Sequence, residues 1–299
     1  MDKRDEKLKK HGRFRLIVMA CYVAVTNGYI KGFMEGKIYT GPLKKVCVPG
    51  LNCYSCPGAL GACPIGSLQA TLGSRHYKMA FYVIGLLMIF GAFLGRFVCG
   101  FLCPFGLVQE LLHKIPFVKK LRKLPGEKYL RWLKYVILAV FVILLPLVVV
   151  DITGTGDPWF CKYICPSGTL FGGIPNILLN SGLRSAAGFL FDWKVAVLII
   201  AALLSIVIYR PFCRYLCPLG AVYSLFNKIS IYRYTVNEDK CVSCGVCQKT
   251  CGFDIKVWQN PNSVDCIRCG NCRAACPKSA IEIVKPLGTK ETSSEAAMK

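Results

Sequence analysis

Histidine is scarce in this chain, with only three among 299 residues. His76 and His113 lie at opposite ends of the second apolar segment and its extension, and His11 lies in a basic leader. The sequence therefore offers no evident pair of histidine ligands for a haem iron. It also lacks a glycine pattern typical of nucleotide binding, which argues against direct oxidation of NAD(P)H by this chain.

Acidic residues are also few, 16 against 38 Lys and Arg, which gives a net charge of +22. Such an excess can indicate nucleic-acid binding. Here, however, the basic residues cluster beside apolar segments, and the preference for positive charge on the inner side of membranes explains them more simply. We therefore expect a membrane lipid environment and no nucleic-acid partner.

Four apolar segments are candidate membrane spans, 14–30, 79–98, 135–150 and 195–209. The first is diluted by Thr26 and Asn27 and could instead be an uncleaved signal or a buried helix. The leader 1–15 carries seven Lys and Arg and the segment 113–134 carries eight, whereas 152–194 carries three. This bias predicts a prokaryotic cytoplasmic membrane protein with both termini in the cytoplasm. The connection 31–78 also contains lysines, but an even number of spans places it outside.

Cysteine is abundant, with 19 residues, and the unit Cys-Pro-x-Gly recurs four times, beginning at Cys63, Cys103, Cys165 and Cys217. Proline is favoured as the first residue of a helix, so each unit predicts a short helix whose free N–H groups face a thiolate. An iron–sulfur cluster held by four thiolates is an anion, and helix N-termini stabilise anions. Cysteines that merely pack inside membrane helices would not predict this repeated proline.

The predicted topology pairs these cysteines. The inner face receives Cys99, Cys103, Cys213 and Cys217, and the outer face receives Cys161, Cys165 and Cys63. For the fourth outer ligand we choose Cys56, which is also followed by proline, with Cys53 as the alternative. Cys47 and Cys53 could instead form an external disulfide, and Cys21 is expected to serve packing.

The length of the third span supports two sites within the membrane. The segment 135–150 rises about 24 Å as a helix, less than the roughly 30 Å hydrocarbon core. The cysteine units must therefore dip into the bilayer from both faces, which non-helical backbone tolerates when it is buried in protein. Two such sites would approach each other and favour electron tunnelling.

Two runs near the C-terminus, "CVSCGVCQKTC" and "CIRCGNCRAACP", have the C-x2-C-x2-C-x3-C spacing of two-cluster ferredoxins, in which the fourth cysteine serves the other cluster. One predicted ligand set is Cys241, Cys244, Cys247 and Cys276, and the other is Cys266, Cys269, Cys272 and Cys251. Zinc sites usually separate two C-x2-C pairs by a longer gap. The first run ends in Cys251-Gly252, where the ferredoxin pattern has Cys-Pro.

The combination of "NCYSCPGALGACPIGSLQ", the repeated C-x3-C-P unit and two ferredoxin runs resembles the NapH/MauN-type membrane ferredoxins over nearly the whole chain. The resemblance implies four spans, cytoplasmic ferredoxin clusters and electron flow between the quinone pool or cytoplasm and an external redox partner. We expect an α-helical membrane protein with an inverted repeat of cluster motifs and a C-terminal α+β ferredoxin domain. The predicted division is a leader 1–13, a membrane domain 14–235, a ferredoxin domain 236–284 and a disordered tail 285–299.

The leading functional hypothesis is an electron-transfer subunit of oxidoreductase class, with four 4Fe–4S clusters and redox partners in a larger membrane complex. A second hypothesis is a quinol dehydrogenase at one face, with Gln109, Glu110 and Asp151 near the quinone. A third is copper or thiol chemistry during assembly of another metalloenzyme, since soft thiolates also suit Cu(I). The six methionines give the third no support, because none lies beside these motifs. A sensor that uses its clusters as a redox switch is a fourth hypothesis.

Overall fold

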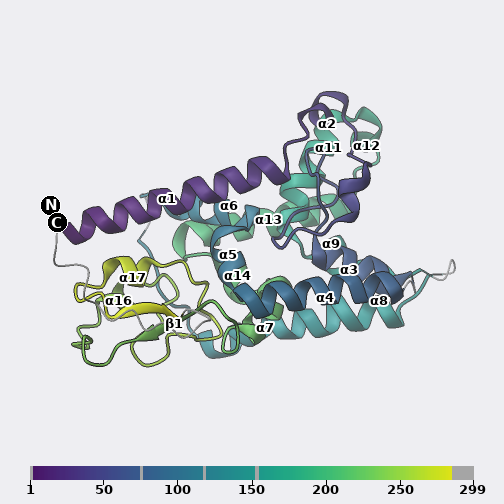
Figure 1. Ribbon diagram of the computed structural model, residues 1–299. Coiled ribbons are helices and arrows are strands. Elements are labelled where there is room, and N and C mark those ends of the chain that lie inside the picture. Colours follow the sequence, from purple (N-terminus) through teal and green to yellow (C-terminus); the bar gives the residue numbers. More distant parts are fainter. Residues whose placement is uncertain (1–2, 75–76, 117–118, 152–154, 285–299) are drawn as a thin grey trace.

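The computed structural model describes residues 3–74, 77–116, 119–151 and 155–284. The tail 285–299, for which we expected disorder, lies outside the described residues. The described chain is mainly helical, and the longest helical runs extend along the long dimension of the molecule (Figure 1). They are α1 (Lys3–Thr26), α4 (Tyr77–Leu94), α13 (Phe189–Val207), and a continuous run of α7 (Glu127–Ile137), the π-helical η2 (Leu138–Leu144) and α8 (Leu145–Val148).

Two of the four expected spans are long and apolar enough to cross a membrane, Glu127–Val148 and Phe189–Val207. A third helix, Phe81–Leu94, is apolar but shorter, and α1 carries the charged leader in its first half. Only 22% of the first long segment and 11% of the second is buried inside the protein. Apolar side chains that face outward along a whole helix are typical of a lipid-facing surface.

Short helices begin at each repeated cysteine unit. They are α3 (Pro64–Gly73), α6 (Pro104–His113), α10 (Pro166–Gly168) and α15 (Pro218–Phe226), preceded in three cases by α5 (Phe97–Phe101), α9 (Trp159–Tyr163) and α14 (Pro211–Tyr215). Each Cys-Pro places proline at the first helical turn and cysteine at the N-cap, as the sequence predicts. The backbone N–H three residues later donates to the thiol of Cys103, Cys165 and Cys217.

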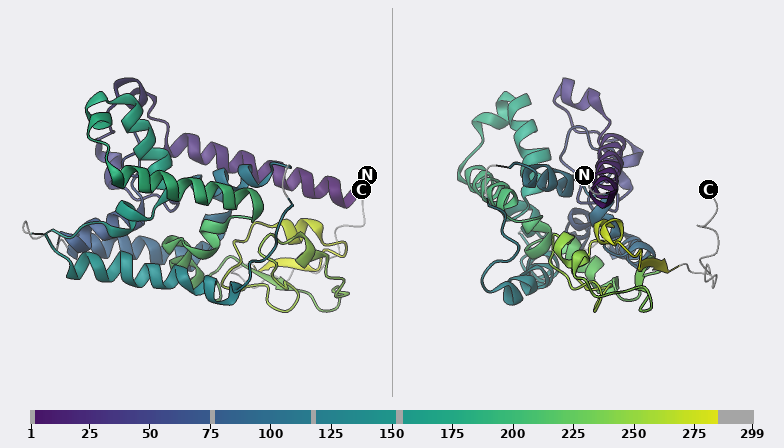
Figure 2. Two further views of the ribbon diagram at one scale, coloured as in Figure 1. Left: turned by 180° about the vertical axis from the view of Figure 1, so that it is seen from behind. Right: turned by 90° about the vertical axis from the view of Figure 1, so that its left-hand side faces the viewer.

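Two groups of elements lie at opposite ends of the molecule (Figures 1 and 2). One end holds α2 (Ile30–Glu35), α11 (Ile174–Leu179) and α12 (Ser181–Ser185), together with the short turns η1 (Pro42–Lys45) and η3 (Thr169–Gly173). The other end holds the ferredoxin domain with α16 (Val246–Thr250), α17 (Asn271–Ala275), β1 (Arg233–Val236) and β2 (Ile281–Val284). The two strands pair antiparallel, with Arg233 opposite Val284.

The ferredoxin domain packs firmly on the helical domain. One buried apolar cluster continues from Phe212 in the helical domain to Phe253 and Ile267 in the ferredoxin domain. Helix α1 lies along α17, where the imidazole Nε2 of His11 hydrogen-bonds the carbonyl oxygen of Cys269 at 2.8 Å. The two domains therefore form one body with a shared interior.

Buried ion pairs fix this interface. Asp265 of the ferredoxin domain accepts from Lys134 at 2.6 Å and from Arg131 at 2.7 Å, and lies 3.6 Å from Arg96. Burial alone would raise the pKa of Asp265, but the Lys134 and Arg96 charges hold it below its usual value. Asp265 thus remains ionised and joins the two domains.

We expect Asp265→Asn to lower the free energy of unfolding by about 3–5 kcal/mol, because it leaves buried cations without their partner. Denaturation of the detergent-solubilised protein, followed by tryptophan fluorescence, measures the change. The control is Glu282→Gln, which breaks the exposed Lys240–Glu282 pair and should cost about 0–1 kcal/mol. Equal effects of the two substitutions would contradict the role assigned to Asp265.

Candidate metal centres

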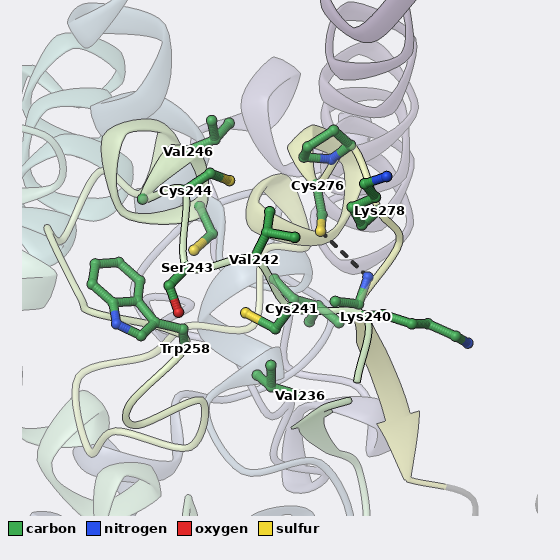
Figure 3. A pocket seen from close by; sticks show the side chains of 15 residues that line it. Val236, Lys240, Cys241, Val242, Ser243, Cys244, Val246, Trp258, Cys276 and Lys278 are labelled. Atoms are coloured by element: carbon green, nitrogen blue, oxygen red, sulfur yellow. Dashed lines mark hydrogen bonds between the residues drawn. The ribbon is translucent and has the colours of Figure 1, made fainter. Parts of the chain in front are cut away.

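The first ferredoxin ligand set surrounds one cavity near the surface of the domain, with about 420 Å³ of empty space that includes open solvent. Cys241, Cys244, Cys247 and Cys276 all line it, and Figure 3 shows the labelled cysteines around this space with Trp258 at its side. The backbone N–H of Ala280 donates to the Cys276 thiol at 3.3 Å. Cys244 is exposed, so this cavity lies closer to solvent than the other cysteine sites.

The second ferredoxin ligand set lines a cavity of about 380 Å³ on the side that faces the helical domain. Its thiols are those of Cys251, Cys266, Cys269 and Cys272. Tyr209 and Arg268 complete the wall, and the Tyr209 ring comes from the helical domain. Cys276 of the second run thus lines the first cavity, and Cys251 of the first run lines the second, while the binding of a cluster by each set stays a prediction.

The two ferredoxin halves repeat each other at an offset of 25 residues. Residues with left-handed backbone occur at matching positions, Ser243 with Arg268, Gly245 with Gly270, and Asp254 with Ser279. Most of these are not glycine, and non-glycine residues in this region are held there by their surroundings, often at functional sites. Equivalent backbone in both halves indicates two equivalent binding loops.

Two of the buried ferredoxin thiols ionise less readily than an exposed cysteine. Burial raises the pKa of the Cys266 thiol to about 12, and burial followed by the charge of Cys269 raises that of Cys251 to about 11. Metal binding displaces such protons, because the thiolate is the ligand. The four-thiol sets and their N–H donors thus fit iron–sulfur clusters.

Steric crowding explains why position 252 is glycine. A Cβ at Gly252 would strike the ring of Tyr209, so the proline found there in the ferredoxin pattern would not fit. The Tyr209 hydroxyl donates to Glu110 at 3.3 Å, and its ring packs edge-on against Phe253. The departure from the ferredoxin pattern therefore makes room for a residue of the helical domain.

The four cysteines of the predicted inner set lie near one another, and their role as ligands stays a prediction. Electrostatic interactions link the buried thiols of Cys99, Cys103, Cys213 and Cys217. The carboxamide of Gln109 spans the two cysteine pairs, since its Nε2 donates to Cys213 Sγ at 3.1 Å and its Oε1 accepts from the N–H of Phe212 at 3.1 Å. Gln109 thus orients the Cys213 thiol toward the site.

The outer site has the same design. The carboxamide of Gln69 donates to Cys161 Sγ at 3.3 Å and accepts from the N–H of Phe160 at 2.9 Å. Gln69 stands six residues after Cys63, just as Gln109 stands six residues after Cys103. Sequence reasoning overlooked this glutamine, although the repeated spacing C-P-x-G-x-x-Q was available to find it.

The fourth thiol at the outer site is that of Cys53. Its Sγ lies 3.8 Å from the position of a Cβ on Gly168, as does Cys165 Sγ. Electrostatic interactions also join Cys53 to Cys63 and Cys161. Our first choice, Cys56, instead interacts with Cys53, Lys44 and local backbone. Cys53, the alternative ligand, therefore has the contacts with the other three thiols that our first choice lacks.

The remaining cysteines and the residues considered for quinone binding have other surroundings. Cys47 is buried as a free thiol, whereas Cys21 is exposed on α1 and does not pack in the protein interior. Glu110 is paired with Arg15 and Arg210, and Gln109 is occupied by the inner cysteine pair. Asp151 is exposed, and its N–H donates to Thr155 at 2.9 Å. These contacts give Gln109 and Glu110 structural roles of their own.

Among the described residues, no three His, Cys, Asp or Glu side chains converge closely enough to bind a single metal ion. A zinc ion holds its sulfur ligands about 2.3 Å away and so draws them together. In a 4Fe–4S cluster each thiolate binds a different iron, so the four sulfur atoms lie farther apart than the ligands of a single metal ion.

The family described as 4Fe-4S binding domain matches three segments of this chain, 76–125, 138–178 and 192–232. These segments contain the C-x3-C-P pairs that begin at Cys99, Cys161 and Cys213. No solved structure matches the chain.

Several curated proteins are similar over most of the chain. The methylamine utilization ferredoxin-type protein MauN of Paracoccus denitrificans is 30% identical over 79% of this chain and 75% of its own length. An uncharacterized protein of Methanocaldococcus jannaschii is 30% identical over 67% of this chain and 68% of its own. The putative electron transport protein YccM of Escherichia coli is 26% identical over 83% of this chain and 66% of its own length.

The choice between Cys53 and Cys56 can be tested by iron analysis. We expect Cys53→Ala to remove about four irons per chain, the content of one cluster, and Cys56→Ala to remove none. Iron and acid-labile sulfide are counted in anaerobically purified variants. Loss of iron in Cys56→Ala with full occupancy in Cys53→Ala would reverse the assignment.

Proposed function

The chain belongs to the MauN/NapH-type ferredoxin family of electron-transport proteins, and on this premise we propose that it conducts electrons across a membrane through four 4Fe–4S clusters. The observation that carries the proposal is the arrangement of sixteen cysteines in four sets along one molecule. The proposed ligand sets are Cys241, Cys244, Cys247 and Cys276; Cys251, Cys266, Cys269 and Cys272; Cys99, Cys103, Cys213 and Cys217; and Cys53, Cys63, Cys161 and Cys165. Each such cluster supplies one-electron redox chemistry.

Electrons would enter or leave at the first ferredoxin set. Its thiol Cys244 is exposed, so a soluble donor could approach there. The second set is more buried and lies toward the helical domain. Helix α16 lines the first cavity and α17 lines the second, and the two helices pack against each other. The second set is thus shielded from solvent and remains close to both the first ferredoxin set and the inner set.

Backbone contact connects the second ferredoxin set to the inner set. A Cβ on Gly100, which lies between Cys99 and Cys103, would strike the Ile267 carbonyl and lie 3.7 Å from Cys269 Cα. Two ligand loops therefore touch at this glycine. Such close approach between ligand loops supports direct electron transfer across the domain interface.

The inner and outer sets are joined by Tyr223 and by the chain segment before Cys53. Tyr223 is fully buried and interacts electrostatically with Cys99 and Cys63, which belong to different sets. Its hydroxyl donates to the Pro49 carbonyl at 3.0 Å. The short segment from Pro49 to Cys53 thus reaches from the inner site to the outer one.

We further propose four membrane spans, with the ferredoxin domain at the cytoplasmic end and the outer set near the opposite face. The positive leader and the ferredoxin domain lie together, which agrees with the positive-inside bias. The redox partners would be a cytoplasmic or quinone donor and an external protein in the same membrane complex. The chain would act as an oxidoreductase subunit rather than as a separate catalyst.

The iron content tests the number of clusters. We expect about sixteen irons per chain in anaerobically purified protein, because four sites would each hold four. A value near eight would leave only the ferredoxin domain with iron. The membrane thiols would then need another role, such as copper or disulfide chemistry.

Sealed liposomes test whether electrons cross the bilayer through the protein. With a reductant inside and an impermeant acceptor outside, we expect acceptor reduction with the unaltered protein and none with Cys161→Ser/Cys165→Ser. This double variant should retain about twelve irons and so isolates the outer site. Equal rates for both proteins would refute transfer through that site.

A further inference from the structure

Two fully buried arginines connect the cysteine pairs of the inner site reciprocally. Arg96 Nη2 donates to the carbonyl of Cys213 at 2.9 Å, and Arg210 Nη1 donates to the carbonyl of Cys99. Each arginine stands three residues before the first cysteine of its own pair and reaches the first cysteine of the other. The site is therefore enclosed by two guanidinium groups in equivalent positions.

The glycines of the Cys-Pro-x-Gly units make this arrangement possible. A Cβ on Gly106 would lie 3.0 Å from Arg210 Nη1, and one on Gly220 would lie 3.2 Å from Arg96 Nη2. Each guanidinium thus rests on the first helical turn after a ligand cysteine. Arg210 also has a left-handed backbone, with φ of 49°, which is typical of residues held in place at functional sites.

Positive charge exceeds negative charge in the two ion-pair networks to which Arg96 and Arg210 belong. Within the described residues of these networks, six cations share three carboxylates. The cations are Arg15, Arg96, Arg131, Lys134, Arg210 and Arg214, and the carboxylates are Glu110, Glu127 and Asp265. Unbalanced charge in a low-dielectric interior is costly unless an anion compensates it.

The outer site lacks these arginines. Pro158 stands three residues before Cys161, and Gly50 stands three residues before Cys53. Cys53 of the outer site interacts electrostatically with Lys194 and with Lys44, whose Nζ donates to the Ala59 carbonyl at 2.7 Å. The glutamine is thus common to both sites, whereas the pair of guanidinium groups is specific to the inner one.

We propose that Arg96 and Arg210 raise the reduction potential of the inner cluster above that of the outer cluster, so that electrons reside at the inner site. This inference rests on the proposed function. Reduction adds one negative charge, and nearby buried cations stabilise the more negative state. Both arginines act as positioning and electrostatic residues, because they contact ligand backbone rather than the reacting partner.

Redox titration followed by electron paramagnetic resonance tests the proposal. The inner and outer signals are assigned by their loss in Cys213→Ser/Cys217→Ser and in Cys161→Ser/Cys165→Ser. In unaltered protein the inner signal should have the higher potential. At a fixed ambient potential, Arg210→Gln should lower the ratio of reduced to oxidised inner cluster about tenfold. This change corresponds to a fall of about 59 mV in the reduction potential of the inner cluster, for a one-electron couple.

Matched variants separate charge from structure. Arg210→Lys keeps the charge and should retain most of the potential, whereas Arg96→Gln should lower it as Arg210→Gln does. Arg184→Gln removes an exposed arginine from α12 and should change neither signal.

The outcomes distinguish this inference from the proposed function. Full iron content with unchanged inner potential in both glutamine variants would overturn the role of the arginines and leave the conduit intact. An outer potential above the inner one in unaltered protein would overturn the inference even if the variants fail to fold. Absence of any inner or outer signal, with about eight irons, would instead overturn the four-cluster function.

Discussion

The placement of charged thiolate sites inside a low-dielectric interior is the constraint on which this structure depends. A buried anion without compensation is strongly unfavourable, and so is a buried cation. The chain resolves both by surrounding the inner cysteine set with guanidinium groups that are themselves only partly neutralised by Glu110 and Asp265. The same carboxylates hold the ferredoxin domain and α1 in place, so the electrostatics of the site and the assembly of the domains are inseparable.

The repeated Cys-Pro-x-Gly unit satisfies this constraint with local backbone structure. Cysteine at an N-cap, proline after it and glycine two residues later give a helix start that donates N–H groups to the thiol and leaves space for a neighbour. At Gly106 the neighbour is a guanidinium group, whereas at Gly66 it is the thiol of Cys161. One backbone design therefore serves two sites whose charge environments differ.

Sequence reasoning succeeds where the determinant is local. The helix starts at Cys103 and Cys217 follow from the sequence alone, because the proline after each cysteine fixes the backbone of the first turn. The choice of Cys53 over Cys56 depends on how the segment lies against Gly168, a contact distant in sequence, and no local pattern reveals it. No sequence motif marks Arg96 and Arg210, since their contacts with the Cys213 and Cys99 carbonyls join segments distant in sequence.

The interface also explains why the ferredoxin domain departs from its usual pattern at one residue. Proline after the fourth cysteine would collide with Tyr209, and Tyr209 is held by Glu110, which also pairs with Arg15 of α1 and with Arg210. Glycine at 252 lets a helical-domain side chain enter the wall of the second ferredoxin cavity. A ferredoxin that exchanged freely with solution would have no need of this opening. The substitution therefore fits a module that packs against the helical domain, with its second cavity on the side of that domain.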